Sequence, residues 1–299
     1  MESSFSPRRS WWVRILRALG WTYVLFVLGS ILWVLAYRFV DPPMTFTMLG
    51  DLVAGRGIER QWMSLDRIDR DAVRAAIAGE DGKYCEHGGF DLQAIEAAMR
   101  RNARGGSIIR GGSTISQQTA KNAFLWQGGG WFRKGLEAWF TVLIERLWDK
   151  SRIMEVYLNV AETGIGTYGV NAGAQRYFGH DASALSPEEA ARIAAVLPLP
   201  KRREAATPTG FTRRYGNMIA ARMAVVAREG LDGCVYGGAR APFERPEPAR
   251  VPAPRRAPAP APLPLPGEEL EAPAPPPPPD PPGPPVEEAA PPSPDVNGM

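Results

Sequence analysis

The sequence predicts a mostly α-helical domain joined to one membrane-spanning helix and a proline-rich tail, and three observations support this. Apolar residues recur at intervals of three and four from Asp69 to about Ala227, the spacing of helices with one buried face. Runs of alternating β-branched residues, typical of strands, are missing from that range. An uncharged apolar stretch near the N-terminus is long enough to cross a bilayer, and most of the 30 prolines follow Ala241.

The predicted membrane anchor covers residues 18–37, with arginines at both flanks and tryptophans near both ends. Four arginines among residues 1–17 outweigh Glu2, so residues 1–17 are expected to stay in the cytoplasm. A cleaved signal peptide is the alternative, but its apolar region is usually about 7–15 residues long, and 35–38 is a poor cleavage site. We therefore expect an uncleaved anchor, with everything after Arg38 across the membrane.

Residues 38–65 contain prolines, glycines and short apolar pieces, and predict a membrane-proximal connector. Residues 66–235 predict the helical domain. Its clearest expected helices are 73–78 ending at Gly79, 91–104, one begun by the capping box of Thr114 and Gln117, 131–148, one from Ser186–Pro187 to Pro198, and 212–227.

Charge and cysteine content exclude some classes of protein. A formal charge of +3 does not indicate a nucleic-acid partner. With two cysteines, Cys85 and Cys234, and two histidines, zinc sites of four cysteines or three histidines are excluded. A disulfide is possible outside the cytoplasm, but we do not expect one, because Cys85 lies inside the central motif described next and Cys234 near the end of the domain.

The central motif is the stretch 76–91, in which an apolar helical run delivers two adjacent carboxylates, Glu80 and Asp81. A carboxylate at the end of a buried helix, where apolar walls raise its pKa, suits a general acid or base. A solvated helix end explains this stretch alone equally well. The rest of the chain has to decide between them.

Two further segments carry groups that suit an anionic substrate. Residues 111–114 form a glycine-rich turn at a helix start, with Lys121 two turns later, and free backbone N–H groups at such a start bind phosphate. An ordinary capped turn is the alternative, and the spacing is not that of a Walker motif. Glu137 follows Arg133 and Lys134 by one helical turn, and its alternative is a surface ion pair with Arg133.

The segment 164–169 has the formal spacing of a dinucleotide-binding fingerprint, which we reject. The residues before it have helical rather than strand spacing, and the chain shows no strand–helix–strand pattern. A glycine-rich turn between helices is the preferred interpretation. Nucleophile-elbow and penicillin-binding motifs are also missing, which leaves carboxylates, cations and an anion-binding turn beyond a membrane.

In this order the segments resemble the peptidoglycan glycosyltransferases of family 51, over roughly Asp66 to Tyr215. Glu80–Asp81 with Tyr84, His87 and Gly89 resembles the motif Glu-Asp-x-x-Phe-x-x-His-x-Gly. Three more segments match further family motifs: 111–122 with its Gly-Gly-Ser-Thr-Ile-Ser-Gln-Gln run, 133–137, and 150–159. The single anchor and the lack of transpeptidase motifs resemble the monofunctional members rather than bifunctional penicillin-binding proteins.

The resemblance implies a lysozyme-like fold and a polymerase that joins a lipid-pyrophosphate-linked glycan strand to lipid II. Glu80 would deprotonate the 4-hydroxyl of the acceptor, and Glu137 would organise the leaving pyrophosphate, through a divalent cation (Mg²⁺ or Mn²⁺) or the neighbouring cations. No organic cofactor is expected. The other substrate-binding residues that the resemblance implies are Asp81, Gly112, Ser113, Thr114, Gln117, Gln118, Lys121, Arg133 and Lys134, with Gln117 and Gln118 lining the cleft.

The implied location is the bacterial inner membrane, with the catalytic domain in the periplasm, and the implied partners are lipid II, the lipid-linked strand and the membrane. Two alternatives stay open: a lytic transglycosylase or lysozyme-like hydrolase, and a catalytically silent scaffold. The tail, 236–299, is expected to be disordered or polyproline II. It could be inert, a spacer, or a docking arm for other wall-synthesis or division proteins.

The sequence departs from the family pattern in three places. Tyr84 replaces the usual Phe, Leu136 stands where some members have lysine, and Gly129 stands where arginine is frequent. The last departure predicts weaker binding of the donor.

Overall fold

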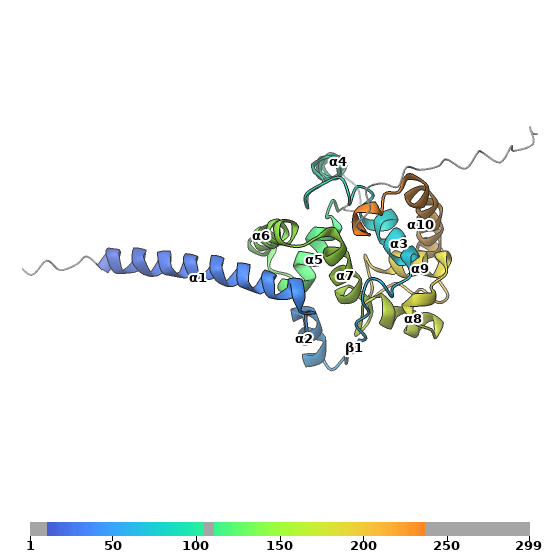
Figure 1. The fold of residues 1–299 in the computed structure, drawn as a ribbon, viewed down its shortest axis with the longest axis horizontal. Coiled ribbons are helices and arrows are strands. Elements are labelled where there is room, and N and C mark those ends of the chain that lie inside the picture. The colour runs from blue at the N-terminus through green and yellow to red at the C-terminus, as the bar shows by residue number, and fades with distance from the viewer. Residues whose placement is uncertain (1–10, 105–110, 237–299) are drawn as a thin grey trace, which may run out of the picture. The chain divides into compact units, whose positions relative to one another are not determined.

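The structure is a computed structural model that describes residues 11–104 and 111–236 (Figure 1). The expectations for residues 1–10 and for the proline-rich tail from residue 237 lie outside these ranges. Within them the chain is mostly helical, as predicted, with ten α-helices and three very short strands.

The anchor helix α1 (Trp11–Phe39) is apolar and long enough to cross a membrane, and it includes the predicted residues 18–37. Its first half exposes its leucines, whereas its second half packs on the domain. There Trp139 donates its indole N–H to Ser30 Oγ at 3.0 Å, and Trp148 donates to the Val34 carbonyl at 2.8 Å. The end of the anchor is therefore fixed to the domain that follows it.

The connector has more structure than the sequence indicated. It forms α2 (Phe46–Val53) and β1 (Glu59–Arg60), and β1 pairs with β3 (Thr167–Tyr168), which pairs in turn with β2 (Glu162–Gly164). The segment 164–169, expected to be a turn between helices, is thus part of a short antiparallel hairpin. Asp51 of α2 is 1% exposed and bonds Tyr168 and Lys201, so the connector is fastened to the domain.

The remaining helices follow the order that the sequence indicates, and where bounds were predicted they agree within a few residues. The helix at 170–178 was not predicted. These helices are α3 (Arg70–Glu80), α4 (Leu92–Ala103), α5 (Ile115–Phe124), α6 (Gly130–Leu147), α7 (Lys150–Val160), α8 (Val170–Phe178), α9 (Pro187–Val196) and α10 (Gly210–Glu229), with 3₁₀ turns η1 (Ala182–Ala184) and η2 (Gly233–Val235). Asp69, Asp91, Thr114 and Ser186 cap α3, α4, α5 and α9 through their side chains.

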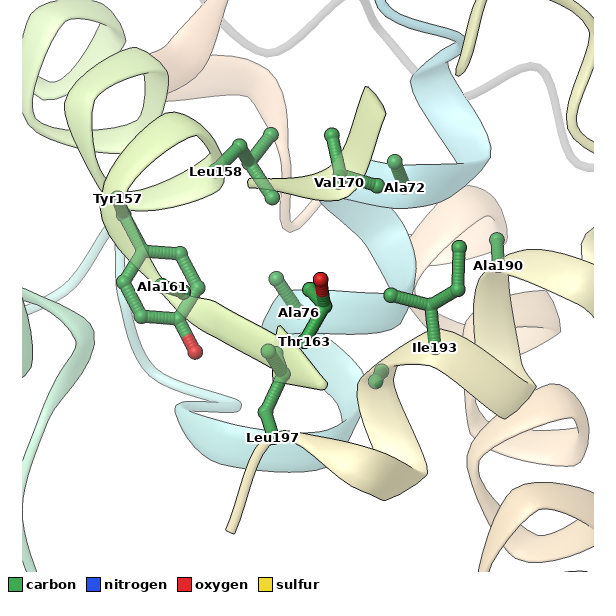
Figure 2. A pocket seen from close by; sticks show the side chains of 11 residues that line it. Ala72, Ala76, Tyr157, Leu158, Ala161, Thr163, Val170, Ala190, Ile193 and Leu197 are labelled. Atoms are coloured by element: carbon green, nitrogen blue, oxygen red, sulfur yellow. The ribbon is translucent and has the colours of Figure 1, made fainter. Parts of the chain in front are cut away.

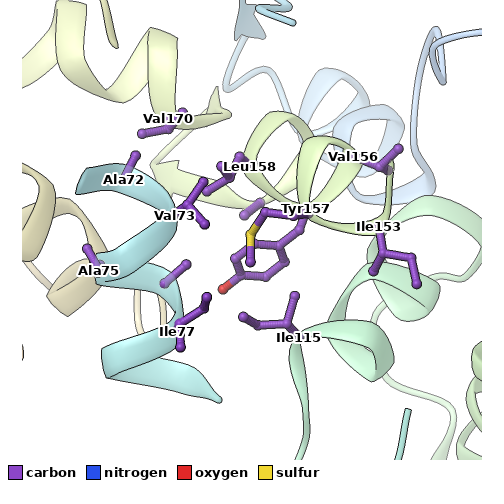
Figure 3. Close-up of a cluster of buried hydrophobic side chains, with 14 of the residues drawn as sticks. Ala72, Val73, Ala75, Ile77, Ile115, Ile153, Val156, Tyr157, Leu158 and Val170 are labelled. Atoms are coloured by element: carbon purple, nitrogen blue, oxygen red, sulfur yellow. The ribbon is translucent and has the colours of Figure 1, made fainter. Parts of the chain in front are cut away.

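The core has two groups of helices. Helices α3, α9 and α10 pack together, and α5 packs on α6 and α7 (Figure 1). Figure 3 shows where the groups meet, with Ile77 of α3, Ile115 of α5 and Tyr157 of α7 in contact range. Burying these apolar side chains is the main stabilising term of the fold.

The expectation that Cys85 and Cys234 stay unpaired is wrong, because they form a disulfide. Their Cα atoms are 5.6 Å apart across a sequence separation of 149 residues. The sequence argument failed because η2 folds back onto the turn after α3. The buried Asp232, just before η2, also accepts hydrogen bonds from Arg70 and Arg74 of α3. The central motif is thereby tied covalently to the end of the domain.

Candidate active site

Glu80 is the last residue of α3, so the helix extends one residue past its expected end at Gly79. One carboxylate oxygen, Oε2, accepts a hydrogen bond from Gln118 Nε2 at 2.8 Å. The other, Oε1, is buried and has no hydrogen-bond partner among the described residues. A buried carboxylate with a free oxygen is prepared to take a proton from a ligand.

Burial raises the pKa of Glu80 above its ordinary value of 4.5, because a charged carboxylate loses its hydration there. The hydrogen bond from Gln118 and the charges of Arg203 and Lys121 act in the opposite direction, and the charge of Asp81 adds to the rise. A general base needs a pKa raised toward the working pH, and this surrounding provides the right direction.

Asp81 differs from its neighbour because its carboxylate points into the protein. It is 6% exposed, contacts His87 Nε2 at 2.9 Å and accepts the backbone N–H of Ile115 at 3.0 Å. Both of its oxygens therefore have partners inside the protein, and Asp81 joins the end of α3 to the start of α5.

The turn before α5 lies close to α4, and three of its backbone donors are in use. A Cβ at Gly112 would come within 3.1 Å of Ile95 Cα, so a side chain there is crowded. The backbone N–H groups of Thr114, Ile115 and Gln117 bond protein acceptors rather than pointing outward. Ser113 brings this turn to the cations of α6, since its Oγ is 3.4 Å from Lys134 Nζ.

Two predicted site residues of α5, Gln117 and Gln118, face different sides of the helix. Gln118 faces the cleft and holds Glu80. Gln117, expected to line the cleft, is instead 4% exposed and completes the capping box with Thr114. The physical reason is that neighbouring helical residues point about 100° apart, so only one of the pair faces outward.

Glu137 is the second glutamate of the site and lies on α6, 2% exposed. Arg133 Nη1 donates to its Oε2 at 2.9 Å, and Lys134 Nζ donates to its Oε1. The side-chain ammonium of Lys121 makes no hydrogen bond within the described residues, and burial is the largest effect that lowers its pKa, opposed by the charges of Glu137 and Glu80. The interpretation of Glu137 as part of an exposed surface pair is therefore wrong.

A cleft of about 350 Å³ lies beside Glu80. Predicted Gln118 and Lys121 line it. The other lining residues were not predicted as site residues, although Asn122 and Tyr157 stand in the family motifs 111–122 and 150–159. They are Thr47, Asn122, Gln127, Tyr157, Ala161, Glu162 and residues 197–202. Tyr157 could have been found, because it stands in the 150–159 family motif, whereas Thr47 comes from the connector and carried no signal.

A second cavity lies behind the cleft and has a different character. Its volume is about 10 Å³, and apolar side chains from α3, α7 and α9 surround it (Figure 2). It is an internal packing gap, too small for a sugar. The cleft with Gln118 and Lys121 is the candidate active site.

A protein-built cation site does not fit the described residues. They contain no group of three or more histidine, cysteine, aspartate or glutamate side chains that could hold a metal ion. Both oxygens of Glu137 are bound to Arg133 and Lys134, so a cation would have to displace them. The charge that faces an anionic ligand here belongs to side-chain cations.

Comparison with known proteins agrees with this geometry. A family profile described as Transglycosylase matches residues 47–224. A biosynthetic peptidoglycan transglycosylase of Caulobacter vibrioides is 48% identical over 213 residues, covering 71% of this chain and 93% of the relative. A protein of the same name from Pseudomonas putida is 50% identical over 216 residues, covering 70% and 89%. The chain therefore belongs to the transglycosylase family.

Proposed function

We propose that this transglycosylase polymerises peptidoglycan glycan strands from lipid II at the surface of the bacterial inner membrane. The observation that supports this most is that Lys121, which lines the cleft, interacts with the charges of two different glutamates, Glu80 and Glu137. Glu80 offers a free carboxylate oxygen of raised pKa, and Glu137 is surrounded by cations that suit a pyrophosphate. A base on one side and positive charge on the other match the two ends of a glycosyl transfer.

In the proposed reaction the 4-hydroxyl of lipid II gives its proton to Glu80 as its oxygen attacks the anomeric carbon of the strand. The bond from that carbon to the pyrophosphate oxygen breaks, its electron pair stays on the pyrophosphate, and the configuration inverts. Lys121, Arg133 and Lys134 compensate the charge that develops on the leaving group. Ser113 would contact the same group, and Asp81, Thr114 and Gln117 would position the turn that carries it.

The anchor supports the same proposal. Helix α1 could place the domain at a membrane, and the arginines on its N-terminal side favour a cytoplasmic N-terminus and a periplasmic domain. The disulfide of Cys85 and Cys234 suits an oxidising compartment outside the cytoplasm. Substrates held in the same membrane would meet the cleft at high effective concentration.

Purified protein supplied with lipid II tests the proposal. Long glycan strands on a gel are the expected product. Unchanged lipid II together with degraded wall polymer would instead identify a lytic enzyme, for which Arg133 and Lys134 have no evident use on a neutral glycan. No reaction with either substrate would favour the silent scaffold. The assay is run with added Mg²⁺ and with a chelator, because a contribution from a divalent cation stays a prediction.

A further inference from the structure

Tyr157 carries a buried polar group that the fold does not use. The residue is 0% exposed, and its hydroxyl has no hydrogen-bond partner among the described residues. Buried hydroxyl groups without a partner are rare in native proteins, because their hydration is lost without compensation. Such a group calls for a ligand or a water molecule as its partner.

Neighbouring tyrosines show that loose packing is not the reason. Tyr84 donates its hydroxyl hydrogen to the Lys150 carbonyl at 2.8 Å, and Tyr215 donates to the Gly79 carbonyl at 2.8 Å. Tyr168 and Tyr177 each have a partner at 2.8 Å as well. Tyr157 is therefore an exception in a domain that otherwise satisfies its tyrosine hydroxyls.

The ring and the hydroxyl of Tyr157 have separate surroundings. Figure 3 shows the ring packed between α3 and α5, a position that phenylalanine would fill as well. The hydroxyl points toward α3 near Ile77, one turn before Glu80. Tyr157 also lines the cleft together with Gln118, the residue that holds Glu80.

Glu80 provides the complementary unpartnered atom. Its Oε1 is also buried and lacks a hydrogen-bond partner among the described residues. Burial raises the pKa of Tyr157 most, and the charge of Glu80 raises it next, so the Tyr157 hydroxyl keeps its proton. One atom is a pure acceptor, and the other can donate.

We propose that Tyr157 is a further substrate-positioning residue, whose hydroxyl and Glu80 Oε1 together hold one hydroxyl group of the acceptor sugar. The sugar hydroxyl donates its hydrogen to Glu80 Oε1 and accepts a hydrogen bond from Tyr157. When the sugar oxygen attacks, its proton moves to Glu80, and the Tyr157 proton stays where it was. The inference rests on the proposed function and adds a residue to it.

The test compares two single-atom deletions in full-length protein supplied with lipid II. Tyr157→Phe removes the unused hydroxyl, and Tyr84→Phe removes one that bonds backbone and restores the residue usual in the family. Loss of one neutral hydrogen bond to the substrate predicts a fall of about three- to tenfold in kcat/KM for Tyr157→Phe. Its Tm should stay the same or rise, because no protein partner is lost.

Tyr84→Phe should behave in the opposite way. It should keep wild-type kcat/KM and lose roughly 2–4 °C in Tm, through its bond to Lys150. A Tyr157→Phe protein with kcat/KM within about twofold of wild type, or with a lowered Tm that accounts for its lost activity, would overturn the inference. If wild-type protein itself makes no strands, the proposed function fails first, and the inference fails with it.

Discussion

The two glutamates of the candidate site, Glu80 and Glu137, have opposite surroundings. Glu80 has one neutral hydrogen-bond donor, Gln118, and one free oxygen, and burial raises its pKa. Glu137 is more deeply buried, yet both of its oxygens face cations of its own helix. The same side chain is thus prepared for proton transfer in one place and for charge balance in the other, and the difference lies in the neighbours.

The segments that carry Glu80 and Glu137 are also held in place by different contacts. The turn after Glu80 is fastened within the domain, by the disulfide of Cys85 and by Asp81 with His87. The helix that carries Glu137 packs on α5 and also on α1. Phe140 lies in an aromatic cluster with Trp33 of α1, at a ring distance of 6.0 Å. The base is therefore held by contacts within the domain, and the cation cluster lies on a helix that also contacts α1.

Glu80→Gln should have the largest effect on activity. A positioned general base contributes about 10²–10⁴-fold, so kcat for strand synthesis should fall by that factor. The fold should survive, because glutamine keeps an oxygen for the Gln118 bond. Strand synthesis by the variant and by Glu96→Gln, an exposed surface-pair control, is the measurement. Near-normal synthesis by Glu80→Gln would remove Glu80 as the base and favour the scaffold hypothesis.

Loss of the disulfide should give the largest effect on stability. For a cross-link that spans 149 residues, replacing Cys85 and Cys234 together by serine should lower the free energy of unfolding by about 2–5 kcal/mol. Chemical denaturation of the variant, of oxidised wild type and of reduced wild type measures this. Reduced wild type should match the double variant. Equal stability of the oxidised and reduced proteins would mean that the bridge does not restrain the Glu80 region.

Glu137→Gln should lower both strand synthesis and stability by a moderate amount. Glu80→Gln, in contrast, should lower strand synthesis strongly and leave the fold intact. Arg133 and Lys134 would lose their carboxylate, and since the side chain of Lys134 is 41% exposed, the cost should be about 1–2 kcal/mol. Strand synthesis should fall roughly tenfold, through weaker organisation of the pyrophosphate side. Melting curves and initial rates are compared with those of Glu80→Gln. A Glu137→Gln protein with wild-type Tm would contradict the cation-paired geometry.

The sequence predicted the helices well because local signals define them. Capping side chains such as Thr114 and Ser186 act within one turn, and apolar spacing is a local property. The disulfide and the pairing of β1 with β3 depend on contacts between distant segments, which no local pattern records. The connector looked irregular for the same reason, because its buried Asp51 finds partners far along the chain.

The sequence predicted which residues belong to the site better than it predicted which way their side chains point. Family motifs pointed to both glutamates, and the structure brings Glu80 together with Gln118 and Lys121 at one cleft. The inward turn of Asp81 and Gln117 could not be read from sequence, because it depends on which side of a helix end faces the core. The sequence likewise did not show the backbone conformation of Gly129. Its φ of +88° and a Cβ within 3.0 Å of Arg133 Cβ make Gly129→Arg a strained replacement, whatever it adds to donor binding.

The smallest effect concerns the pH dependence of stability, and it tests the surroundings of Glu80 directly. A carboxyl group whose pKa is raised in the folded state stabilises the fold when protonated, and this contribution is lost as the pH rises through the folded-state pKa. At neutral pH the buried charge of Glu80 is therefore a cost, which glutamine removes. Glu80→Gln should have a slightly higher Tm than wild type at pH 7, and the difference should vanish below the ordinary value of 4.5.

Melting temperatures of both proteins between pH 4 and 8 measure this difference, and titration of all other groups cancels in the comparison. The exposed control Glu96→Gln should show no such trend. The same raised pKa predicts that kcat/KM of wild type increases with pH through its acid limb, as Glu80 loses its proton. A Glu80→Gln protein that is less stable than wild type at pH 7 would mean that Gln118, Lys121 and Arg203 outweigh burial, and Glu80 would then resemble Glu137 rather than contrast with it.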